Sequence, residues 1–166
     1  PQSLLDLRVR YTDQWYELNL DTLPPNLTNL DITVNLIHYT AESRFPPNLT
    51  NLYLEVLGFD NPYLDFISWL PTQLKRFKLQ VFDGESYQGI KPDIRFPNSL
   101  TWLSIPMLRY ECLIDILPPN LVYLEFNDDE DDISRTWPKN QLQRLPPSLT
   151  VARGLFEPII GESYAK

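Results

Sequence analysis

Hydrophobic and polar positions recur in one fixed pattern along the chain. The phrase LPPNLTNLDI at 23–32 returns as FPPNLTNLYL at 45–54 and as LPPNLVYLEF at 117–126. If the first proline of each copy is numbered place zero, seven copies begin 21 to 28 residues apart, at Pro1, Pro24, Pro46, Pro71, Pro97, Pro118 and Pro146. Units of this length that cannot bury an apolar face alone are typical of solenoids, in which neighbouring units stack into one core.

The apolar places within the unit predict one short strand per copy. Leucine occupies place three of every copy, and places six and eight are large and apolar in the first six copies. A spacing of two puts both side chains on the same face of a β-strand. Proline fixes φ and lacks an N–H group, so it suits the residues just before a strand. We therefore expect parallel strands side by side, whereas Ala152 and Gly154 predict that the last copy is a closing cap.

Place two of the unit is polar in every copy. Its residues are Ser3, Asn26, Asn48, Gln73, Ser99, Asn120 and Ser148. Side chains of this kind bond to nearby backbone groups at turns. Two explanations stay open: a stacked polar row that satisfies the backbone of the turns, or the ordinary preference of these residues for turns.

The segments between the expected strands differ from copy to copy. Residues 61–70 and 109–117 predict a helical turn or two, and residues 84–96 predict a loop. The predicted fold is an α/β solenoid: a leucine-rich-repeat curved parallel β-sheet with a mostly irregular or short-helical convex side. We expect a single solenoid of about seven repeats over 1–154, followed by a C-terminal tail or cap over 155–166.

The places between the buried ones predict a solvent-exposed sheet face. Places five, seven and nine alternate with places six and eight, so they point to the concave side. On that side the sequence gathers an aromatic and basic patch: Tyr53, Arg76, Lys78, Trp102 and Tyr123. Aromatic and arginine side chains are frequent anchors of protein interfaces, so we predict a protein-binding site here. The alternative is that these aromatics only reflect the preference of strands for such residues.

The unit resembles two groups of leucine-rich repeats. It is similar to the Leu-Pro-x-x-Leu-x-x-Leu-x-Val type of bacterial effector proteins. That type has asparagine at place eleven of the unit, and here only Asn35 matches it. It also resembles the FNIP repeats of social amoebae and of giant viruses of amoebae, through LGFDNP at 57–62 with LPTQLKRFKL at 70–79, and through IKPDIRFPNSLTWLSI at 90–105. The resemblance spans residues 1–151 and implies a protein-interaction module.

Composition and charge narrow the classes of partner. The 166 residues are 43% hydrophobic, which suits one globular domain, and the net charge is −8. An acidic chain lacks the basic footprint that nucleic acid or an anionic membrane requires. No apolar run approaches the roughly 20 residues of a membrane helix. With one cysteine the chain forms no internal disulfide, and we expect it in the cytoplasm, or in the virion if it is viral. Because it begins at Pro1, we expect a processed chain or a piece of a longer one.

Little in the sequence predicts chemistry. The single histidine, His38, and the single cysteine, Cys112, lie in different repeats, and we interpret them as a surface or packing residue and as a buried thiol. No glycine-rich phosphate loop and no Ser-His-Asp set is present. We therefore predict no enzymatic activity, no cofactor and no metal site. The acidic run NDDEDD at 127–132 predicts a solvated loop, and the alternative is contact with a basic partner or a cation.

Two functions follow from these observations. The first is a non-catalytic protein–protein interaction module that binds a protein partner through the concave sheet face. The second is a structural assembly component, such as a minor component of a viral particle, held by the edges and ends of the solenoid.

Overall fold

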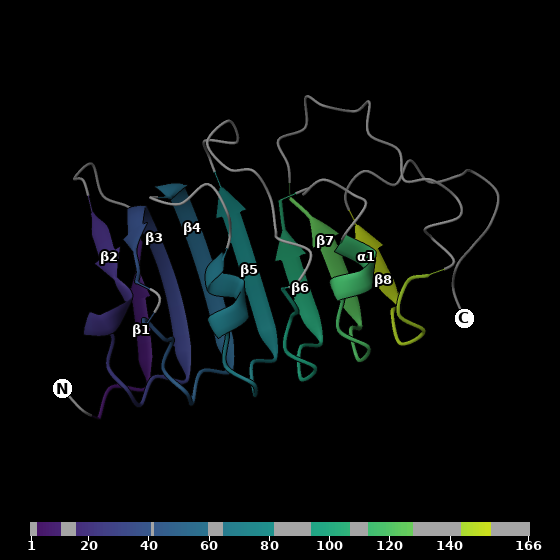
Figure 1. Ribbon diagram of the computed structural model, residues 1–166, viewed down its shortest axis with the longest axis horizontal. Helices are drawn as coiled ribbons and strands as arrows, with labels where there is room; N and C mark the ends of the chain where they lie inside the picture. Colours follow the sequence, from purple (N-terminus) through teal and green to yellow (C-terminus); the bar gives the residue numbers. More distant parts are fainter. Residues whose placement is uncertain are drawn as a thin grey trace.

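The molecule is built around one parallel β-sheet. A computed structural model of the chain describes residues 3–10, 16–40, 42–59, 65–81, 94–106, 113–127 and 144–153. The strands in these ranges are β1 (Asp6–Val9), β2 (Glu17–Asn19), β3 (Asn29–His38), β4 (Asn51–Phe59), β5 (Arg76–Val81), β6 (Trp102–Ile105), β7 (Tyr123–Phe126) and β8 (Val151–Arg153). Their order in the sheet is β1-β3-β4-β5-β6-β7-β8, with β2 paired to β3 (Figure 1).

The register of the sheet aligns equal places of neighbouring units. Leu30 of β3 pairs with Leu52 of β4, Leu52 with Phe77 of β5, and Leu103 of β6 with Leu124 of β7. All of these pairings are parallel, as the repeat predicts, so the expected side-by-side strands are confirmed. The spacing of two residues within each unit is what fixes this register, because a slip of one residue would turn every core side chain to the other face.

Strand β2 is an element that the repeat does not predict. It pairs with the second half of β3, with Leu18 opposite Ile37, whereas β1 pairs with the first half of β3. Leu18 and Ile37 are both buried, so β2 extends the core beyond the strand of the first unit. It lies outside the proline-led phrase, which explains why the spacing of the prolines gives no sign of it.

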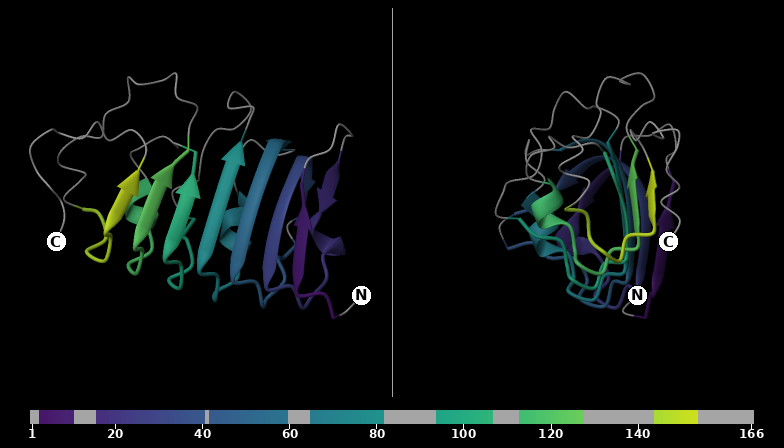
Figure 2. Two further views of the ribbon diagram at one scale, coloured as in Figure 1. Left: turned by 180° about the vertical axis from the view of Figure 1, so that it is seen from behind. Right: turned by 90° about the vertical axis from the view of Figure 1, so that its right-hand side faces the viewer.

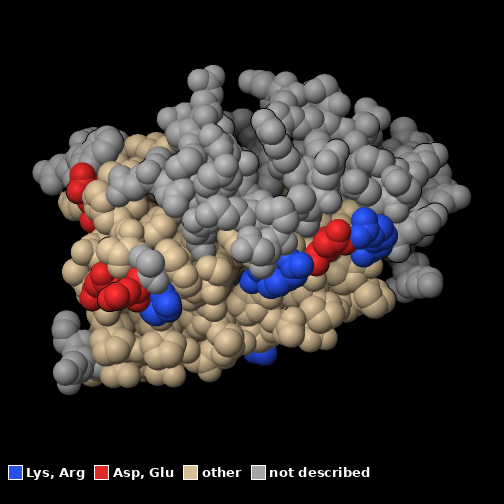
Figure 3. All heavy atoms as spheres, viewed as in Figure 1, with Lys and Arg blue, Asp and Glu red and all other residues tan. Residues whose placement is uncertain are grey.

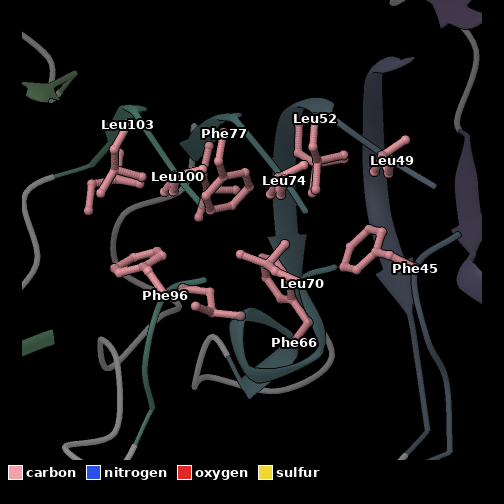
Figure 4. Close-up of a cluster of buried hydrophobic side chains, with 14 of the residues drawn as sticks. Phe45, Leu49, Leu52, Phe66, Leu70, Leu74, Phe77, Phe96, Leu100 and Leu103 are labelled. Carbon is pink, nitrogen blue, oxygen red and sulfur yellow. The ribbon is translucent and has the colours of Figure 1, made fainter. Parts of the chain in front are cut away.

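The core consists of rows of side chains that run across the units. Figure 4 shows nine of them in three rows, all at most 6% exposed: Phe45, Leu70 and Phe96; Leu49, Leu74 and Leu100; Leu52, Phe77 and Leu103. The rows correspond to the place before the proline, place three and place six. Each side chain therefore packs against the same place of the next unit, and the rows join into one hydrophobic core.

Short helices line the side of the core opposite the sheet. They are η1 (Leu20–Thr22), η2 (Asp65–Trp69) and α1 (Leu113–Ile116). Figure 2 shows the sheet as one wall of the solenoid, with η2 and α1 on the other side. The helical turns predicted within 61–70 and 109–117 are confirmed, and most of the loop predicted at 84–96 lies outside the described residues. The molecule is thus a solenoid with a parallel sheet and little helix.

The polar residues at place two of four units connect the turn to the turn before it. Within the turn, the N–H of place three donates to the proline carbonyl, as in Leu74 to Pro71 at 3.0 Å. Ser99 Oγ donates to the carbonyl of Leu74 at 2.6 Å, and Asn120 Nδ2 to that of Asn98 at 3.1 Å. Gln73 and Ser148 donate to the carbonyls of Pro47 and Pro119 in the same way. Of the two explanations, the polar row that satisfies the turn backbone is the one observed for these residues.

The last described strand, β8, differs from the others. Its three residues, Val151–Arg153, are all exposed, including Ala152, which stands opposite the buried Leu124. Alanine at a core place buries too little apolar area to hold a further row. The described sheet therefore loses its regular core at this unit, as Ala152 predicts.

Candidate protein-binding surface

Three aromatic rings gather on the sheet face that is turned away from the core. This is the face predicted above to be concave, and we call it the outer sheet face. Trp102 and Tyr123 are register partners on β6 and β7, and their rings stack with centroids 5.1 Å apart and planes 11° from parallel. Parallel strands lie about 4.8 Å apart, so side chains at the same place of adjacent strands meet at this distance. Tyr53 of β4 meets Trp102 edge-on at 6.1 Å. We call Tyr53, Trp102 and Tyr123 the aromatic cluster.

Two guanidinium groups lie at opposite ends of the stacked pair Trp102 and Tyr123, and we call these four side chains the aromatic stack. Arg76 of β5 lies over the Trp102 ring, 5.0 Å from its centroid, and Arg153 of β8 lies over the Tyr123 ring at 5.8 Å. The order Arg76, Trp102, Tyr123, Arg153 thus runs across four neighbouring strands. A cation over an aromatic face stabilises the pair by about 0.5–1 kcal/mol at an exposed site. The stack is therefore held by its own contacts.

Arg153 belongs to this group of side chains, although the sequence analysis did not predict it. It occupies place seven of the last unit, the same place as Tyr53 and Lys78. The spacing of the repeat assigns Arg153 to the outer sheet face. The two small residues Ala152 and Gly154, however, predict that this unit is a closing cap.

Lys78 lies on the same face but outside the aromatic stack. Its Nζ is 3.4 Å from Glu55, whose other carboxylate oxygen accepts a hydrogen bond of 2.9 Å from the Thr33 hydroxyl. The charge of Lys78 is thereby balanced within the sheet. The structure brings four of the five predicted site residues, Tyr53, Arg76, Trp102 and Tyr123, into one connected group and leaves Lys78 beside it.

Ion pairs distinguish the arginines of this face. Arg8 pairs with Asp6 at 3.1 Å, and Arg10 pairs with Asp31 at 2.7 Å. Within the described part of the chain, Arg76 and Arg153 have no carboxylate within ion-pair distance. The two guanidinium groups of the stack are thus the arginines of this face that aromatic rings, and not acids, hold in place.

The groups around the Tyr123 hydroxyl shift its pKa in opposite directions. Partial burial raises the pKa of Tyr123 above its ordinary value, and the negative charge of Glu125 raises it further, while Arg153 acts in the opposite direction. The phenol therefore stays protonated and remains a hydrogen-bond donor at neutral pH.

A shallow hollow adjoins the aromatic stack. Its volume is about 340 Å³, and its polar lining consists of Arg8, Asn29, Asp31, Asn51, Tyr53 and Arg76. It forms because place five holds the small residues Asn29 and Asn51 on β3 and β4 but large ones from β5 onward. The Asn51 amide donates to Asn29 Oδ1 and to Thr50 Oγ1, which ties down the floor of the hollow.

The expected exposure of the outer sheet face is wrong for part of that face. Thr33, Ser104 and Pro106 occupy places nine, seven and nine, yet all three are buried, with Ser104 fully so. One reason is Asn127, whose Nδ2 crosses the strand ends to the carbonyl of Leu79 at 2.8 Å and lies 3.2 Å from Ser104 Oγ. The exposed part of the face is therefore centred on places five and seven.

The other residues singled out from the sequence carry no site in the described ranges. His38 Nε2 lies 2.9 Å from a carboxylate oxygen of Glu17 on the neighbouring strand. Cys112 and residues 128–132 of the acidic run lie outside the described residues. Among the residues with described positions, no three His, Cys, Asp or Glu side chains gather as metal ligands, and no helix is long and apolar enough to cross a membrane.

The side of the molecule that carries η2 and α1 offers a contrast. On this side the described acidic and basic groups lie scattered among uncharged residues, and some of them lie side by side (Figure 3). Asp115 of α1 forms an ion pair with Arg144. An aromatic ring with a cation over it also occurs away from the outer sheet face, at Arg44 and Trp69, but Trp69 there packs against Tyr39 and the core.

Comparison with known proteins adds no relative. The chain matches no family model, no curated protein and no solved structure.

Proposed function

We propose that the chain is a leucine-rich-repeat module that binds a protein partner through the outer sheet face without catalysing a reaction. The observation that carries this proposal is the stack Arg76–Trp102–Tyr123–Arg153 with Tyr53 at its side. Tryptophan, tyrosine and arginine dominate the energetically important residues of protein interfaces. Held by mutual stacking, these long side chains lose little conformational entropy when a partner orders them further.

The positions of the repeated leucines in the sheet support the proposed repeat class. Places three and six form the buried rows, and the parallel register follows the repeat from β1 to β8. Asn35, the residue that matches the Leu-Pro type at place eleven, is 4% exposed and accepts a 2.7 Å hydrogen bond from the backbone N–H of Tyr16. We extend the solenoid over residues 1–154, with a tail or cap at 155–166.

A structural assembly component is the second candidate, and the two ends of the described sheet favour it. Leu5 precedes the outermost strand β1 and is 56% exposed, and Val151 of the outermost strand β8 is 36% exposed. Apolar residues beside unpaired strand edges are suited to pairing with further strands. In this function the contacts are made at the ends, and the aromatic cluster is not needed.

A selection experiment separates the two candidates. A displayed library of random peptides is selected on the purified chain, and the enriched peptides are measured on the double variant Trp102→Ala/Tyr123→Ala. The matched control is Asp115→Ala/Arg144→Ala, which removes an ion pair on the opposite side of the molecule. Circular dichroism verifies that both variants are folded.

The proposed function predicts that the aromatic double variant loses binding and that the control keeps it. Equal binding to the wild type and to the aromatic double variant contradicts a binding site on the outer sheet face. The assembly function predicts instead that the chain self-associates or joins a particle, and that substitutions at Leu5 and Val151 abolish this association.

A further inference from the structure

Arg76 and Arg153 are held so that their charge remains available to a partner. Each guanidinium group lies over an aromatic ring, which uses the flat face of the group. Its N–H groups lie in the plane of the guanidinium and are the donors that match the two oxygens of a carboxylate. Neither group has a carboxylate within ion-pair distance in the ranges that the structure describes.

The aromatic rings between the two arginines present their edges. Trp102 and Tyr123 stack on each other with planes 11° apart, so their faces are covered by each other and by the two guanidinium groups. The ring edges remain for contact with a partner, whereas the Tyr123 hydroxyl interacts with Glu125 and Arg153. An edge carries partial positive charge, so the whole stack favours electron-rich and apolar groups.

The distance between the two arginines fits an extended peptide. Arg76 and Arg153 lie on β5 and β8, three strand steps apart, and three steps of about 4.8 Å make roughly 14 Å across the strands. Arg153 also stands two residues further along its strand than the register partner of Arg76, so the two Cα atoms are roughly 16 Å apart. An extended chain that crosses the strands rises about 3.3 Å per residue, so four residues cover about 13 Å. The long arginine side chains make up the roughly 3 Å by which the separation exceeds the span of four extended residues. Residues i, i+2 and i+4 of such a chain point to the same side.

We propose that the outer sheet face binds an extended acidic segment of a protein partner, with carboxylates at residues i and i+4 on Arg76 and Arg153. The side chain of residue i+2 then lies on the edges of Trp102 and Tyr123, where an apolar group fits. This proposal rests on the proposed function and specifies the chemistry of the partner.

The charge of the face supports an acidic segment. The whole chain has a net charge of −8, but places five, seven and nine of the described units hold five cations and four carboxylates: Arg8, Arg10, Arg76, Lys78 and Arg153 against Asp6, Asp31, Glu55 and Glu125. Three of the cations are paired within the face, so the two on the stack carry the positive potential. An acidic partner is drawn to this face and repelled by the rest of the molecule.

The hollow beside Arg76 gives the segment room at one end. Arg76 and Tyr53 form part of its wall, and the Tyr53 hydroxyl has no hydrogen-bond partner in the described ranges. A carboxylate on Arg76 is therefore within reach of a second donor. Among the described residues, the register neighbour of Arg153 is the acidic Glu125, so we expect the Arg76 pair to be the stronger of the two.

Synthetic peptides test the spacing of the acids directly. A labelled peptide with glutamates at i and i+4 and leucine at i+2, flanked by glycine and serine, is titrated with the chain by fluorescence anisotropy. Two further peptides carry glutamines in place of the glutamates, or glutamates at i and i+1. We expect the first peptide to bind about tenfold or more tightly than the other two, and its affinity to fall at high salt.

Charge reversal on the protein provides the complementary test. Arg76 is exposed, so Arg76→Glu leaves the core intact, and the milder Arg76→Gln verifies the result if that variant is unstable. We expect Arg76→Glu to weaken the binding of the acidic peptide and to strengthen the binding of a peptide with lysine at i. Arg10→Gln, which removes a cation already paired with Asp31, is the matched control and should retain affinity.

The outcomes distinguish this inference from the function on which it rests. Equal affinity for the acidic and the glutamine peptides, or an Arg76→Glu variant that binds the acidic peptide as the wild type does, overturns the acidic segment. If library peptides without acids still require Trp102 and Tyr123, the proposed function stands while this inference fails. If no peptide requires Trp102 and Tyr123, both fail.

Discussion

The indole ring of Trp102 lies flat against the phenol ring of Tyr123, with centroids 5.1 Å apart. The two residues are 21 positions apart in the sequence but occupy the same place in consecutive units, so the sheet register brings them together. Stacking of this kind stabilises a ring pair by about 0.5–1.5 kcal/mol beyond the burial of its area. A repeat that serves the core therefore also builds an ordered surface on the opposite face of the sheet.

The contact between Arg76 and Trp102 should be measurable as a coupling energy. In a double-mutant cycle of Arg76→Ala and Trp102→Ala, we expect the two changes in the free energy of unfolding to be non-additive by about 0.5–1 kcal/mol. Urea denaturation of the four proteins gives this value. The matched pair is Arg8→Ala with Trp102→Ala, because Arg8 pairs with Asp6 and not with the ring. Additivity in both cycles would refute the cation–π contact.

The buried row at place six should dominate stability. Leu52 is fully buried between Leu30 and Phe77, so Leu52→Ala should lower the free energy of unfolding by about 2–5 kcal/mol. The matched control is Leu5→Ala, since Leu5 is 56% exposed, and we expect a change within about 0.5 kcal/mol. An unchanged melting temperature for Leu52→Ala would show that the register is incorrect.

The hydrogen bonds that place two makes to the preceding turn should contribute to stability. Ser99 Oγ donates to the carbonyl of Leu74 in the preceding unit, so Ser99→Ala should cost about 1 kcal/mol of stability. Ser3 occupies the same place in the first unit, is exposed, and makes no hydrogen bond among the described residues. Ser3→Ala should therefore be neutral in the same urea titration. Equal effects of both substitutions would mean that the row does not link the units.

The titration of Tyr123 should report on its neighbours. Burial and Glu125 raise the pKa of Tyr123 above the ordinary value of 10.0. The native state thus holds the phenol proton more tightly than the unfolded state does. The stability due to this group is fully present below about pH 10 and is lost as the pH rises through the raised value.

Nuclear magnetic resonance of tyrosines labelled at Cζ measures this pKa, with Tyr123→Phe to assign the signal among the nine tyrosines. Removing the charge of Glu125 with Glu125→Gln should lower the pKa part of the way, because burial, the larger cause, remains. A Tyr123 signal that titrates at the ordinary value in the wild type would contradict the described surroundings of the hydroxyl.

Some features of the fold follow from the sequence because they depend on local spacing alone. The alternation of places six and eight fixes which side of each strand is buried, and the proline before it fixes where the strand begins, so the register from Leu30 to Leu124 was predictable. The gathering of Tyr53, Arg76, Trp102 and Tyr123 follows from the same spacing.

Other features depend on contacts between segments that the repeat does not relate. Strand β2 pairs with β3 through residues outside the proline-led phrase. Ser104 is buried because Asn127 reaches over the strand ends. Neither residue type is unusual at its place in the repeat unit. The role of Arg153 depends on the position of the Tyr123 ring, which the composition of the last unit does not reveal.

The constancy of the register has a consequence for how such a chain tolerates insertions. Ile105 and Tyr123 are 18 positions apart, whereas Phe126 and Val151 are 25 apart, yet β6, β7 and β8 remain aligned place by place. Extra residues between the end of one strand and the next proline therefore leave the spacing of Arg76, Trp102, Tyr123 and Arg153 unchanged. Insertions and deletions can thus alter one side of the molecule over evolutionary time, or by engineering, while the other side keeps its geometry.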